Sequence, residues 1–453
     1  MRNQLSKQSF SDTFCILGAY VITMDEDLGD LPHGHVHVTA GSISHVNDAT
    51  ECDLPGERVG GRGRIVSPGF VETHWHLWNT ILRGLASTTA SSRAYFELKD
   101  RLAPLFRPID TYNATMISLA EGLQAGITTV HNWNHNTRSP EDAEASRRAH
   151  QISGGRARFS YSRPHERTHD GMIDAEDLRR VATDWLLQGK SRMLTVGMTG
   201  RNPNALKDPS MSSREWEIAR ELDIPITFHS GGPRSNRKRY ADLPAMHRKG
   251  LLGHDVQLVH AVHATPDEIQ LLADTGTHLS LCPMTQVRDM GGAPPLTQLL
   301  DAGVLVSLSI DTTASVTAAD MFLQMRGAFS IELLRNPESW IVPRHLLQMA
   351  TIDGARDLGF DDVVGSLTPG KRADLLVIDT NTVNMSPCPA PVEQLVLAAR
   401  PDNIERVYVD GKLLVHRGDF TDLNDEEIIS DAKESQAHLL AAAGWDPSRW
   451  DTA

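Results

Sequence analysis

Cysteine is scarce in this chain, and long apolar runs are missing. The four cysteines, Cys15, Cys52, Cys282 and Cys388, are scattered and show none of the CxxC spacing that structural metal sites use. We therefore expect reduced thiols and a cytoplasmic protein. No stretch of about 18 apolar residues is available to span a bilayer. The N-terminal sequence Met1-Arg-Asn-Gln-Leu-Ser-Lys leads into no apolar segment, so a secretory signal is not expected.

Positive charge is also in short supply. Lysine and arginine number 44 against 58 aspartates and glutamates, which gives a formal net charge of −14 at pH 7. Such a balance disfavours nonspecific attraction to nucleic acid or to acidic membrane surfaces. We expect a small-molecule substrate, with neither nucleic acid nor a membrane as a partner.

Two common hydrolase motifs bear on the reaction class. The chain contains no GxSxG, which argues against α/β-hydrolase chemistry. One HExxH occurs, His165-Glu-Arg-Thr-His169, but it follows a strand-like run and precedes the next helix-like stretch, whereas a zincin peptidase carries this motif on a helix. The segment Gly365-Ser-Leu-Thr-Pro-Gly-Lys-Arg372 nearly spells a phosphate-binding loop. Arg372, however, stands where that loop needs a magnesium-binding Ser or Thr, and a strand-like run follows instead of a helix. Phosphate binding is therefore not expected there.

Strand-like and helix-like stretches alternate through the middle of the chain. Eight apolar runs occur, at residues 69–73, 128–133, 157–163, 194–199, 226–229, 256–261, 278–283 and 304–311. Helix-like stretches lie between several of them, at residues 140–152, 175–187, 212–222, 265–273 and 318–334. Eight such alternations predict an α/β fold, a parallel (β/α)8 barrel of the TIM type.

Both ends of the chain show a different pattern. Short strand-like runs broken by Gly and Asp fall between residues 13 and 66, and similar runs follow residue 372. A helical segment is expected over roughly residues 344–358, before the late runs. The last thirty or so residues suggest a terminal helix.

The first barrel run ends in two histidines, within Pro68-Gly-Phe-Val-Glu-Thr-His74-Trp-His76. Side chains two residues apart on a strand share a face, so both imidazoles can reach one metal ion. With 20 histidines in the chain, an HxH pair alone is weak. Two overlapping pairs at residues 33–37 lie in the early β region, and we interpret them as a surface strand. His74 and His76 differ because barrel active sites lie at the C-terminal ends of strands.

Three other predicted strands end in suitable residues. The fifth run ends at His229, the sixth carries His260 and the eighth ends at Asp311. Taken singly, each is better explained as a hydrogen-bonded histidine or a helix-capping aspartate. Their joint position at the predicted catalytic rim favours one shared site.

Together the motifs resemble the amidohydrolase superfamily, in the branch with cytosine deaminase, adenosylhomocysteine-type deaminases and s-triazine hydrolases. The matching segments follow family order over roughly residues 13–420. They are residues 68–76, Ala125-Gly-Ile-Thr-Thr-Val, His260-Ala-Val-His, Cys282-Pro-Met, Ser309-Ile-Asp311, Ala350-Thr-Ile-Asp-Gly-Ala-Arg and Gly365-Ser-Leu-Thr-Pro-Gly-Lys-Arg-Ala-Asp. The resemblance implies a barrel with a small β-sandwich built from both chain ends. We therefore expect a composite β-sandwich domain with a C-terminal helical tail (1–66 and 363–453) and a catalytic barrel (67–362).

The resemblance also implies roles at the matching positions. His74, His76, His229 and Asp311 would hold one divalent metal ion. Zinc is the expected ion, with iron, manganese or cobalt as alternatives, because a nitrogen and oxygen ligand set suits all four. Such an ion lowers the pKa of bound water from about 15.7 to about 7 in favourable sites. Asp311 would accept the proton of that water, and His260 would orient it without binding the metal.

One departure from the family bears on the substrate. In its heterocycle deaminases a glutamate stands three residues after the fifth-strand histidine and protonates a ring nitrogen. This chain has His229-Ser-Gly-Gly232 there. We therefore expect an amidohydrolase that cleaves a non-peptide C–N bond of an amide, urea, carbamate or similar group in a small molecule. A hydrolytic deaminase of an aminated heterocycle, using a glutamate from elsewhere, is the alternative. A metal-dependent decarboxylase and an inactive binding protein are less favoured.

Further residues near the predicted strand ends are candidate substrate contacts. They are Trp78, Trp133, His135, Arg163 and Gln286. For each of them, packing at the rim or a place in a solvated loop explains the residue at least as well. Similar enzymes are often dimers or tetramers, so a homodimer or homotetramer is expected.

Overall fold

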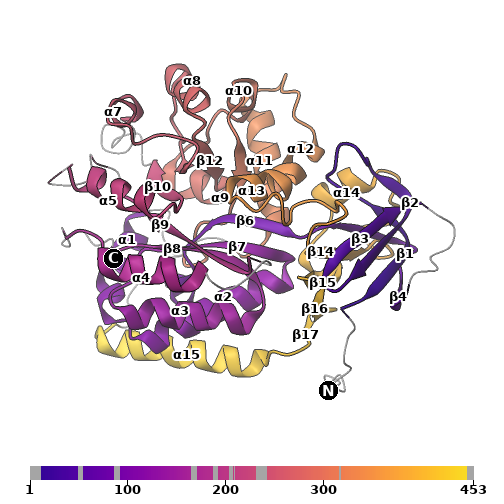
Figure 1. Ribbon diagram of the computed structural model, residues 1–453, viewed down its shortest axis with the longest axis horizontal. Helices are drawn as coiled ribbons and strands as arrows, with labels where there is room; N and C mark the ends of the chain where they lie inside the picture. The colour runs from indigo at the N-terminus through magenta and orange to yellow at the C-terminus, as the bar shows by residue number, and fades with distance from the viewer. Residues whose placement is uncertain are drawn as a thin grey trace.

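A barrel and a neighbouring sheet make up the protein (Figure 1). The computed structural model describes residues 12–48, 55–85, 92–164, 171–186, 192–201, 203, 208, 210–230, 242–315 and 318–445. The sheet combines strands from both ends of the chain. The predicted fold, a TIM-type α/β barrel with a β-domain from the N- and C-terminal segments, is confirmed.

Eight parallel strands follow one another around the barrel in chain order. They are β6 (Phe70–Trp75), β7 (Ile127–Asn134), β8 (Arg156–Tyr161), β9 (Leu194–Thr199), β10 (Ile226–Ser230), β11 (Val256–His260), β12 (His278–Leu281) and β13 (Val306–Leu308). Each overlaps one of the eight predicted runs. Most of their side chains are buried, as expected for strands covered by helices outside and packed against each other inside.

The barrel closes where its first and last strands meet, at their C-terminal ends. The Asp311 amide donates to the His74 carbonyl (2.9 Å), and the His76 amide donates to the Asp311 carbonyl (2.8 Å). Trp75 and Asp311 form a parallel bridge there. The register of β6 shifts between Glu72 and Trp75, a β-bulge of the kind that re-aims side chains near active sites.

Helices lie on the outside of the barrel. They are α2 (Pro108–Gln124), α3 (Pro140–Ser153), α4 (Ala175–Leu186), α5 (Ser210–Glu221), α7 (Leu243–Arg248), α8 (Pro266–Thr275), α10 (Leu296–Asp301) and α11 (Met321–Arg335). The ends of α3 and α8 follow local sequence signals. Each begins with a capping residue and proline, Ser139-Pro140 or Thr265-Pro266, and ends at a left-handed glycine.

Shorter segments occupy the loops. They are η1 (Leu77–Leu82), α1 (Ser92–Leu102), η2 (Ala103–Leu105), α9 (Pro283–Thr285), η5 (Gln286–Met290), α12 (Pro343–Met349), α13 (Ile352–Asp357), α14 (Pro391–Leu397) and η6 (Pro401–Asn403). The helix expected over 344–358 is thus two helices. The carbonyl of Ala350 accepts the Val71 amide of β6 (2.9 Å), which diverts it from continuing the helix.

The second sheet has nine strands, in the order β17-β16-β15-β14-β5-β1-β2-β3, with β4 paired to β1. They are β1 (Phe14–Val21), β2 (Leu31–Thr39), β3 (Ser42–Asn47), β4 (Glu57–Gly60), β5 (Arg64–Pro68), β14 (Leu375–Asp379), β15 (Ile404–Val409), β16 (Lys412–His416) and β17 (Asp419–Phe420). Phe14 of β1 stacks on Tyr408 of β15, with ring centroids 4.4 Å apart. Two strands separate β1 from β15 in the sheet, so it curls back on itself and encloses a core of its own.

The predicted terminal helix is α15 (Asp425–Ala442), and it runs along the barrel, beside α2 (Figure 1). Asn113 of α2 donates to Ser435 Oγ (3.0 Å), and Gln436 donates to the Ile81 carbonyl of η1 (2.5 Å). The tail therefore supports the segment that follows His76. The exact domain boundaries, 66/67 and 362/363, stay a prediction.

Three of the four cysteines, Cys15, Cys282 and Cys388, are free thiols, and Cys52 lies outside the described residues. None of the described helices combines the length and the apolar character needed to cross a membrane.

Candidate metal centre

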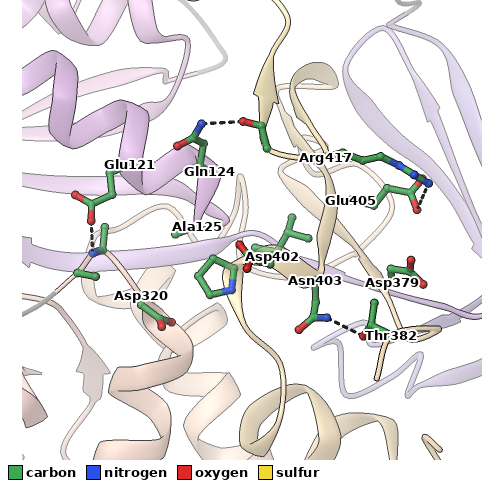
Figure 2. A pocket seen from close by; sticks show the side chains of 15 residues that line it. Glu121, Gln124, Ala125, Asp320, Asp379, Thr382, Asp402, Asn403, Glu405 and Arg417 are labelled. Carbon is green, nitrogen blue, oxygen red and sulfur yellow. Dashed lines mark hydrogen bonds and ion pairs between the residues drawn. The ribbon is translucent and has the colours of Figure 1, made fainter. Parts of the chain in front are cut away.

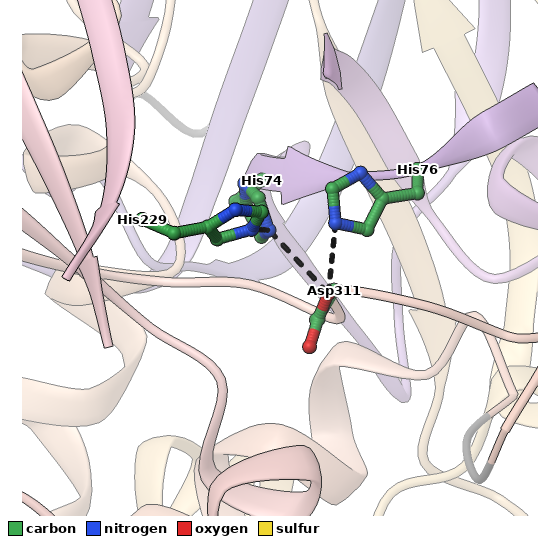
Figure 3. A group of neighbouring side chains, drawn as sticks. All are labelled: His74, His76, His229 and Asp311. Atoms are coloured by element: carbon green, nitrogen blue, oxygen red, sulfur yellow. Dashed lines mark hydrogen bonds and ion pairs between the residues drawn. The ribbon is translucent and has the colours of Figure 1, made fainter. Parts of the chain in front are cut away.

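Four side chains from three parts of the chain converge at the C-terminal rim of the barrel (Figure 3). His74 and the following His76 come from the end of β6, His229 from β10, and Asp311 from the segment after β13. The Asp311 Oδ1 atom lies 3.4 Å from His74 Nε2 and 3.2 Å from His76 Nε2. His229 Nε2 lies 3.2 Å from His74 Nε2.

These separations suit a shared cation. In a tetrahedral site with bonds of about 2.0–2.1 Å, neighbouring ligand atoms lie about 3.3 Å apart. The three distances between ligand atoms given above, 3.2, 3.2 and 3.4 Å, match that value. The four residues are thus spaced as ligands of one ion.

Protonation states point the same way. His76 Nδ1 lies 3.1 Å from the Trp133 carbonyl and donates to it, and the Nε2 atom of the same ring faces the Asp311 carboxylate. Burial lowers the pKa of His74 and of His229 well below the usual range, so both rings are neutral. Burial opposes ionisation of Asp311, but the neighbouring imidazoles of His74 and His76 outweigh it and hold its pKa well below normal. A buried carboxylate that faces three imidazole rings makes a suitable site for a cation.

His260 lies beside the four. Its ring stacks parallel to that of His229, with centroids 5.3 Å apart and planes 4° apart. Burial lowers the pKa of His260 to about 4, so the ring is neutral at neutral pH. His260 also falls within 4.8 Å of ligand atoms of His74 and Cys282. It is therefore placed to hydrogen-bond a molecule at the centre.

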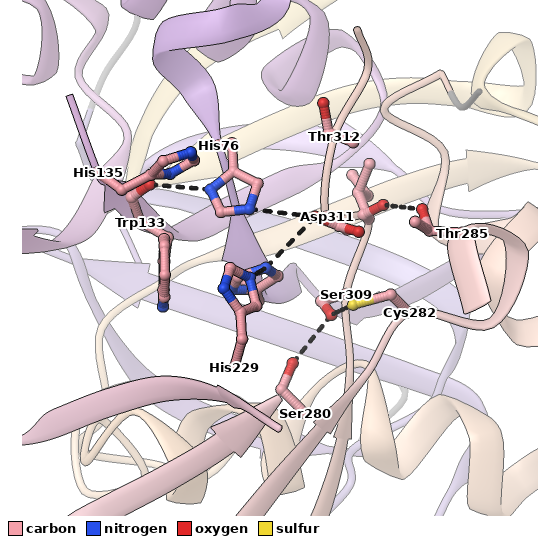
Figure 4. Close-up of polar contacts among 12 residues, drawn as sticks. His76, Trp133, His135, His229, Ser280, Cys282, Thr285, Ser309, Asp311 and Thr312 are labelled. Carbon is pink, nitrogen blue, oxygen red and sulfur yellow. Dashed lines mark hydrogen bonds and ion pairs between the residues drawn. The ribbon is translucent and has the colours of Figure 1, made fainter. Parts of the chain in front are cut away.

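Trp133 and His135 lie against His76 (Figure 4), and Trp78 packs on His135, so these three candidate substrate contacts form an aromatic wall. The ring centroids of His135 and His76 are 4.3 Å apart, and those of Trp133 and His229 are 4.1 Å apart. Trp78 Nε1 donates to His135 Nδ1 (3.3 Å), which places the ring hydrogen of a neutral His135 on Nε2.

The other two candidates are engaged by the protein. Gln286 is buried and donates to the His260 carbonyl (3.0 Å), so it orients the backbone of a residue at the centre. Arg163 donates to the Gly171 carbonyl in the loop after β8. Substrate contact by either residue stays a prediction. Gly232, where the family glutamate is missing, lies outside the described residues.

The rival histidines at 33–37 lie in β2 of the nine-stranded sheet. His37 bonds the Pro55 carbonyl (2.9 Å) and His35 accepts the Gly18 amide (3.2 Å). Among the residues that the structure places, neither belongs to a group able to hold a metal.

Glu72 lies next to the site, but the sequence analysis did not predict a role for it. One of its oxygens accepts the amides of His74 (2.9 Å) and Ile310 (3.1 Å), so the carboxyl links β6 to the segment before Asp311. Burial raises the pKa of Glu72 to about 8, which leaves it protonated at neutral pH. An acidic residue inside an apolar strand, two positions before the first histidine, was the available signal.

A separate pocket of about 670 Å³ lies away from this centre (Figure 2). Gln124 and Ala125 line it and directly precede β7, so it faces the N-terminal end of that strand. Two of its carboxylates have partners: Glu121 accepts the Ala319 amide (3.1 Å), and Glu405 pairs with Arg417 (3.6 Å). Barrel enzymes work at the opposite face, so this pocket is not the candidate active site.

Comparison with known proteins gives related sequences over nearly the whole chain. The 5'-deoxyadenosine deaminase of Methanosarcina mazei is 27% identical over 438 residues, which cover 94% of this chain and 98% of the relative. The 5-methylthioadenosine/S-adenosylhomocysteine deaminase of Halobacterium salinarum is 29% identical over 450 residues, covering 96% of this chain and all of the relative.

Solved structures share the fold. A zinc-bound adenosine deaminase from Xanthomonas campestris superposes with a TM-score of 0.85 at 23% identity, covering 94% of this chain and 98% of that one. A zinc complex of the atrazine chlorohydrolase TrzN from Arthrobacter aurescens gives 0.82 at 22% identity, covering 93% and 100%. The sequence pattern of the amidohydrolase family matches residues 65–414, which include the whole barrel and all four converging side chains. The chain belongs to the amidohydrolase family and is a hydrolase of C–N bonds in small molecules.

Proposed function

We propose that His74, His76, His229 and Asp311 hold one divalent metal ion and that the protein uses it to hydrolyse a non-peptide C–N bond. Zinc is the expected ion, with iron, manganese or cobalt as alternatives. The observation that carries the proposal is the approach of the His74 and His76 Nε2 atoms to one carboxylate oxygen, at 3.4 and 3.2 Å, in a buried site.

The chemistry divides between the ion and the chain. A bound divalent ion supplies acidification of water near neutral pH. Asp311 takes a proton from that water, while neutral His260 orients it and stabilises charge on the oxygen of the attacked carbon. Asp311 then returns the proton to the leaving nitrogen. One water is consumed, its oxygen stays on carbon, and an amine or ammonia departs.

The substrate class follows from what stands after β10. Ring deamination in this family relies on a glutamate at the position of Gly232. An amide, urea or carbamate needs no protonated ring nitrogen, so these groups are the first candidates. The aromatic wall of Trp78, Trp133 and His135 is proposed to contact the substrate.

Deamination of an aminated heterocycle is the second candidate, and the named activities of the sequence relatives favour it. It requires another acid in place of the missing glutamate. Asp289 of η5 is a candidate for this acid, because burial and the charge of Asp311 raise its pKa.

Two measurements test these proposals. Elemental analysis of the purified protein should give about one metal ion per chain. A panel of amides, ureas, carbamates and aminated heterocycles, with 5'-deoxyadenosine among them, is then assayed for released amine or ammonia. Absence of metal would favour a binding protein, and carbon dioxide release a decarboxylase.

Asp289→Asn separates the two substrate classes. If the protein is a heterocycle deaminase that uses Asp289, the variant should lose ammonia release by about 10²-fold or more. If amides are the substrates, the variant should keep most of its turnover.

A cytoplasmic location and a homodimer or homotetramer complete the proposal. Size-exclusion chromatography with light scattering measures the oligomeric state.

A further inference from the structure

The backbone of Asp311 is strained. Its φ is +73°, in the left-handed region that a side chain with a Cβ rarely occupies. Such a conformation persists only where the surroundings hold it. The Asp311 amide and carbonyl are both held by β6, through His74 and His76.

We call the contact between the Asp311 segment and the His74–His76 segment the seam. Two hydrogen bonds between side chains, which we call bridges, continue the seam beyond the strands. Thr312 Oγ1 donates to Asn79 Oδ1 (3.0 Å), and the hydroxyls of Thr80 and Thr313 lie 2.7 Å apart. The four residues come shortly after proposed ligands in the chain. Thr312 and Thr313 directly follow Asp311, and Asn79 and Thr80 come three and four residues after His76. All four side chains are buried.

In each bridge, the residue that belongs to η1 makes a further hydrogen bond. The side-chain Nδ2 of Asn79 donates to the hydroxyl of Tyr95 in α1 (2.8 Å). Thr80 Oγ1 accepts from Ser118 of α2 (2.7 Å), and the same serine hydroxyl lies 3.0 Å from the Leu77 carbonyl. The bridges therefore tie the Asp311 segment to α1 and α2.

We propose that Thr312 and Thr313, through Asn79 and Thr80, are positioning residues of the metal centre. They hold Asp311 in its left-handed conformation and thereby set the place of its carboxylate between His74 and His76. This inference rests on the proposed metal binding. Polar groups that orient metal ligands typically contribute 10- to 100-fold in metal affinity.

Threonine-to-valine variants test it, because valine keeps the branched shape and removes the hydroxyl. In Thr312→Val and Thr313→Val, we expect zinc affinity to fall by about 10- to 100-fold. The affinity is measured by competition with a chelator, on each full-length protein stripped of metal. Thr312→Ser retains a hydroxyl and should restore most of the affinity.

Thr115→Val is the matched control. Thr115 is equally buried, and its hydroxyl donates only to the Thr111 carbonyl within α2 (2.8 Å). This variant should bind zinc as the wild type does, and its metal-free unfolding midpoint should shift about as much as that of Thr313→Val. Wild-type zinc binding with unchanged affinity in both seam variants would overturn the positioning role alone. No zinc binding by the wild type would overturn the proposed function and this inference together.

Discussion

Buried charge is arranged differently at the two ends of the barrel. At the N-terminal end, Arg156 of β8 meets Asp374 in a two-pronged pair, with Nε–Oδ2 and Nη2–Oδ1 distances of 2.9 and 3.0 Å. At the C-terminal rim, Asp311 faces imidazole nitrogens, and the Nδ1 atoms of His74 and His260 are buried without a hydrogen-bond partner among the described residues.

The difference separates stability from function. The Arg156–Asp374 pair has cation, anion and geometry complete within the chain, so it ties the barrel to the second sheet and needs nothing added. The rim has a carboxylate and imidazole nitrogens, and the candidate group formed by the described residues there includes no Lys or Arg. An incomplete polar cluster is costly to bury, which is why we expect it to bind a cation.

Removing a proposed ligand should give the largest effect. In Asp311→Ala or His229→Ala, turnover is expected to fall by about 10⁴-fold, because the proton acceptor or a metal ligand is lost. Zinc content should fall below one per chain in the same samples. His33→Ala, in the exposed part of the rival histidine segment, is the control and should keep both. Retention of full activity in either ligand variant would refute its assignment.

Breaking the pair at the other end should change stability and leave chemistry intact. Arg156→Met leaves the Asp374 carboxylate buried without its partner, so the free energy of unfolding should drop by about 3–5 kcal/mol. Urea unfolding in the presence of chelator measures this drop. Zinc bound per folded chain should stay at the wild-type value. Adding Asp374→Leu should recover part of the loss; a further drop would contradict this account.

Variants of the aromatic wall separate substrate binding from metal binding at the rim. His135→Gln should raise KM about 10-fold, worth about 1.4 kcal/mol, if its Nε2 hydrogen bonds the substrate. Zinc content should not change, since His135 is outside the four-residue group. Trp78→Phe removes the hydrogen bond that fixes the His135 tautomer and should have a smaller effect on KM. Zinc loss in His135→Gln would instead assign the ring to the metal centre.

The barrel and the convergence of four side chains at its rim could be predicted from the sequence because both leave local signals. Apolar runs of strand length recur eight times, and His74, His76, His229 and Asp311 each stand at the end of one. Strand ends of a barrel share a rim, so sequence order alone brings these four together. The capping residues of α3 and α8 marked their boundaries equally well.

What could not be predicted depends on contacts between distant segments. α2 was missed because it is rich in Thr, Ser and Asn, and it is stabilised by burial between the barrel, η1 and α15. The bulge in β6 and the left-handed conformation of Asp311 arise from closure of the barrel, which no local pattern encodes. Thr312 and Asn79 look like ordinary loop residues until the seam brings them together.

The smallest predicted effect is a pH dependence at the N-terminal end, where His278 of β12 meets Asp357 of α13 (Nδ1–Oδ1 3.3 Å). Burial opposes protonation of His278, but Asp357 outweighs it and raises the pKa; burial likewise opposes ionisation of Asp357, but His278 and other donors lower its pKa. The stability from the pair is therefore complete between the unfolded-state values of about 3.9 and about 6.5. It is lost as pH rises through the raised pKa of His278.

The difference in unfolding free energy between wild type and His278→Gln should thus be largest near pH 5.5 and shrink by on the order of 1 kcal/mol at pH 9. Urea unfolding followed by circular dichroism at the two pH values measures it. Arg156→Met supplies the control, because Arg156 stays protonated at both pH values and the destabilisation caused by its loss should stay constant. If the difference in unfolding free energy between wild type and His278→Gln were equal at both pH values, the ring would be neutral in the folded protein. The stabilisation at this end would then rest on the arginine pair without the histidine.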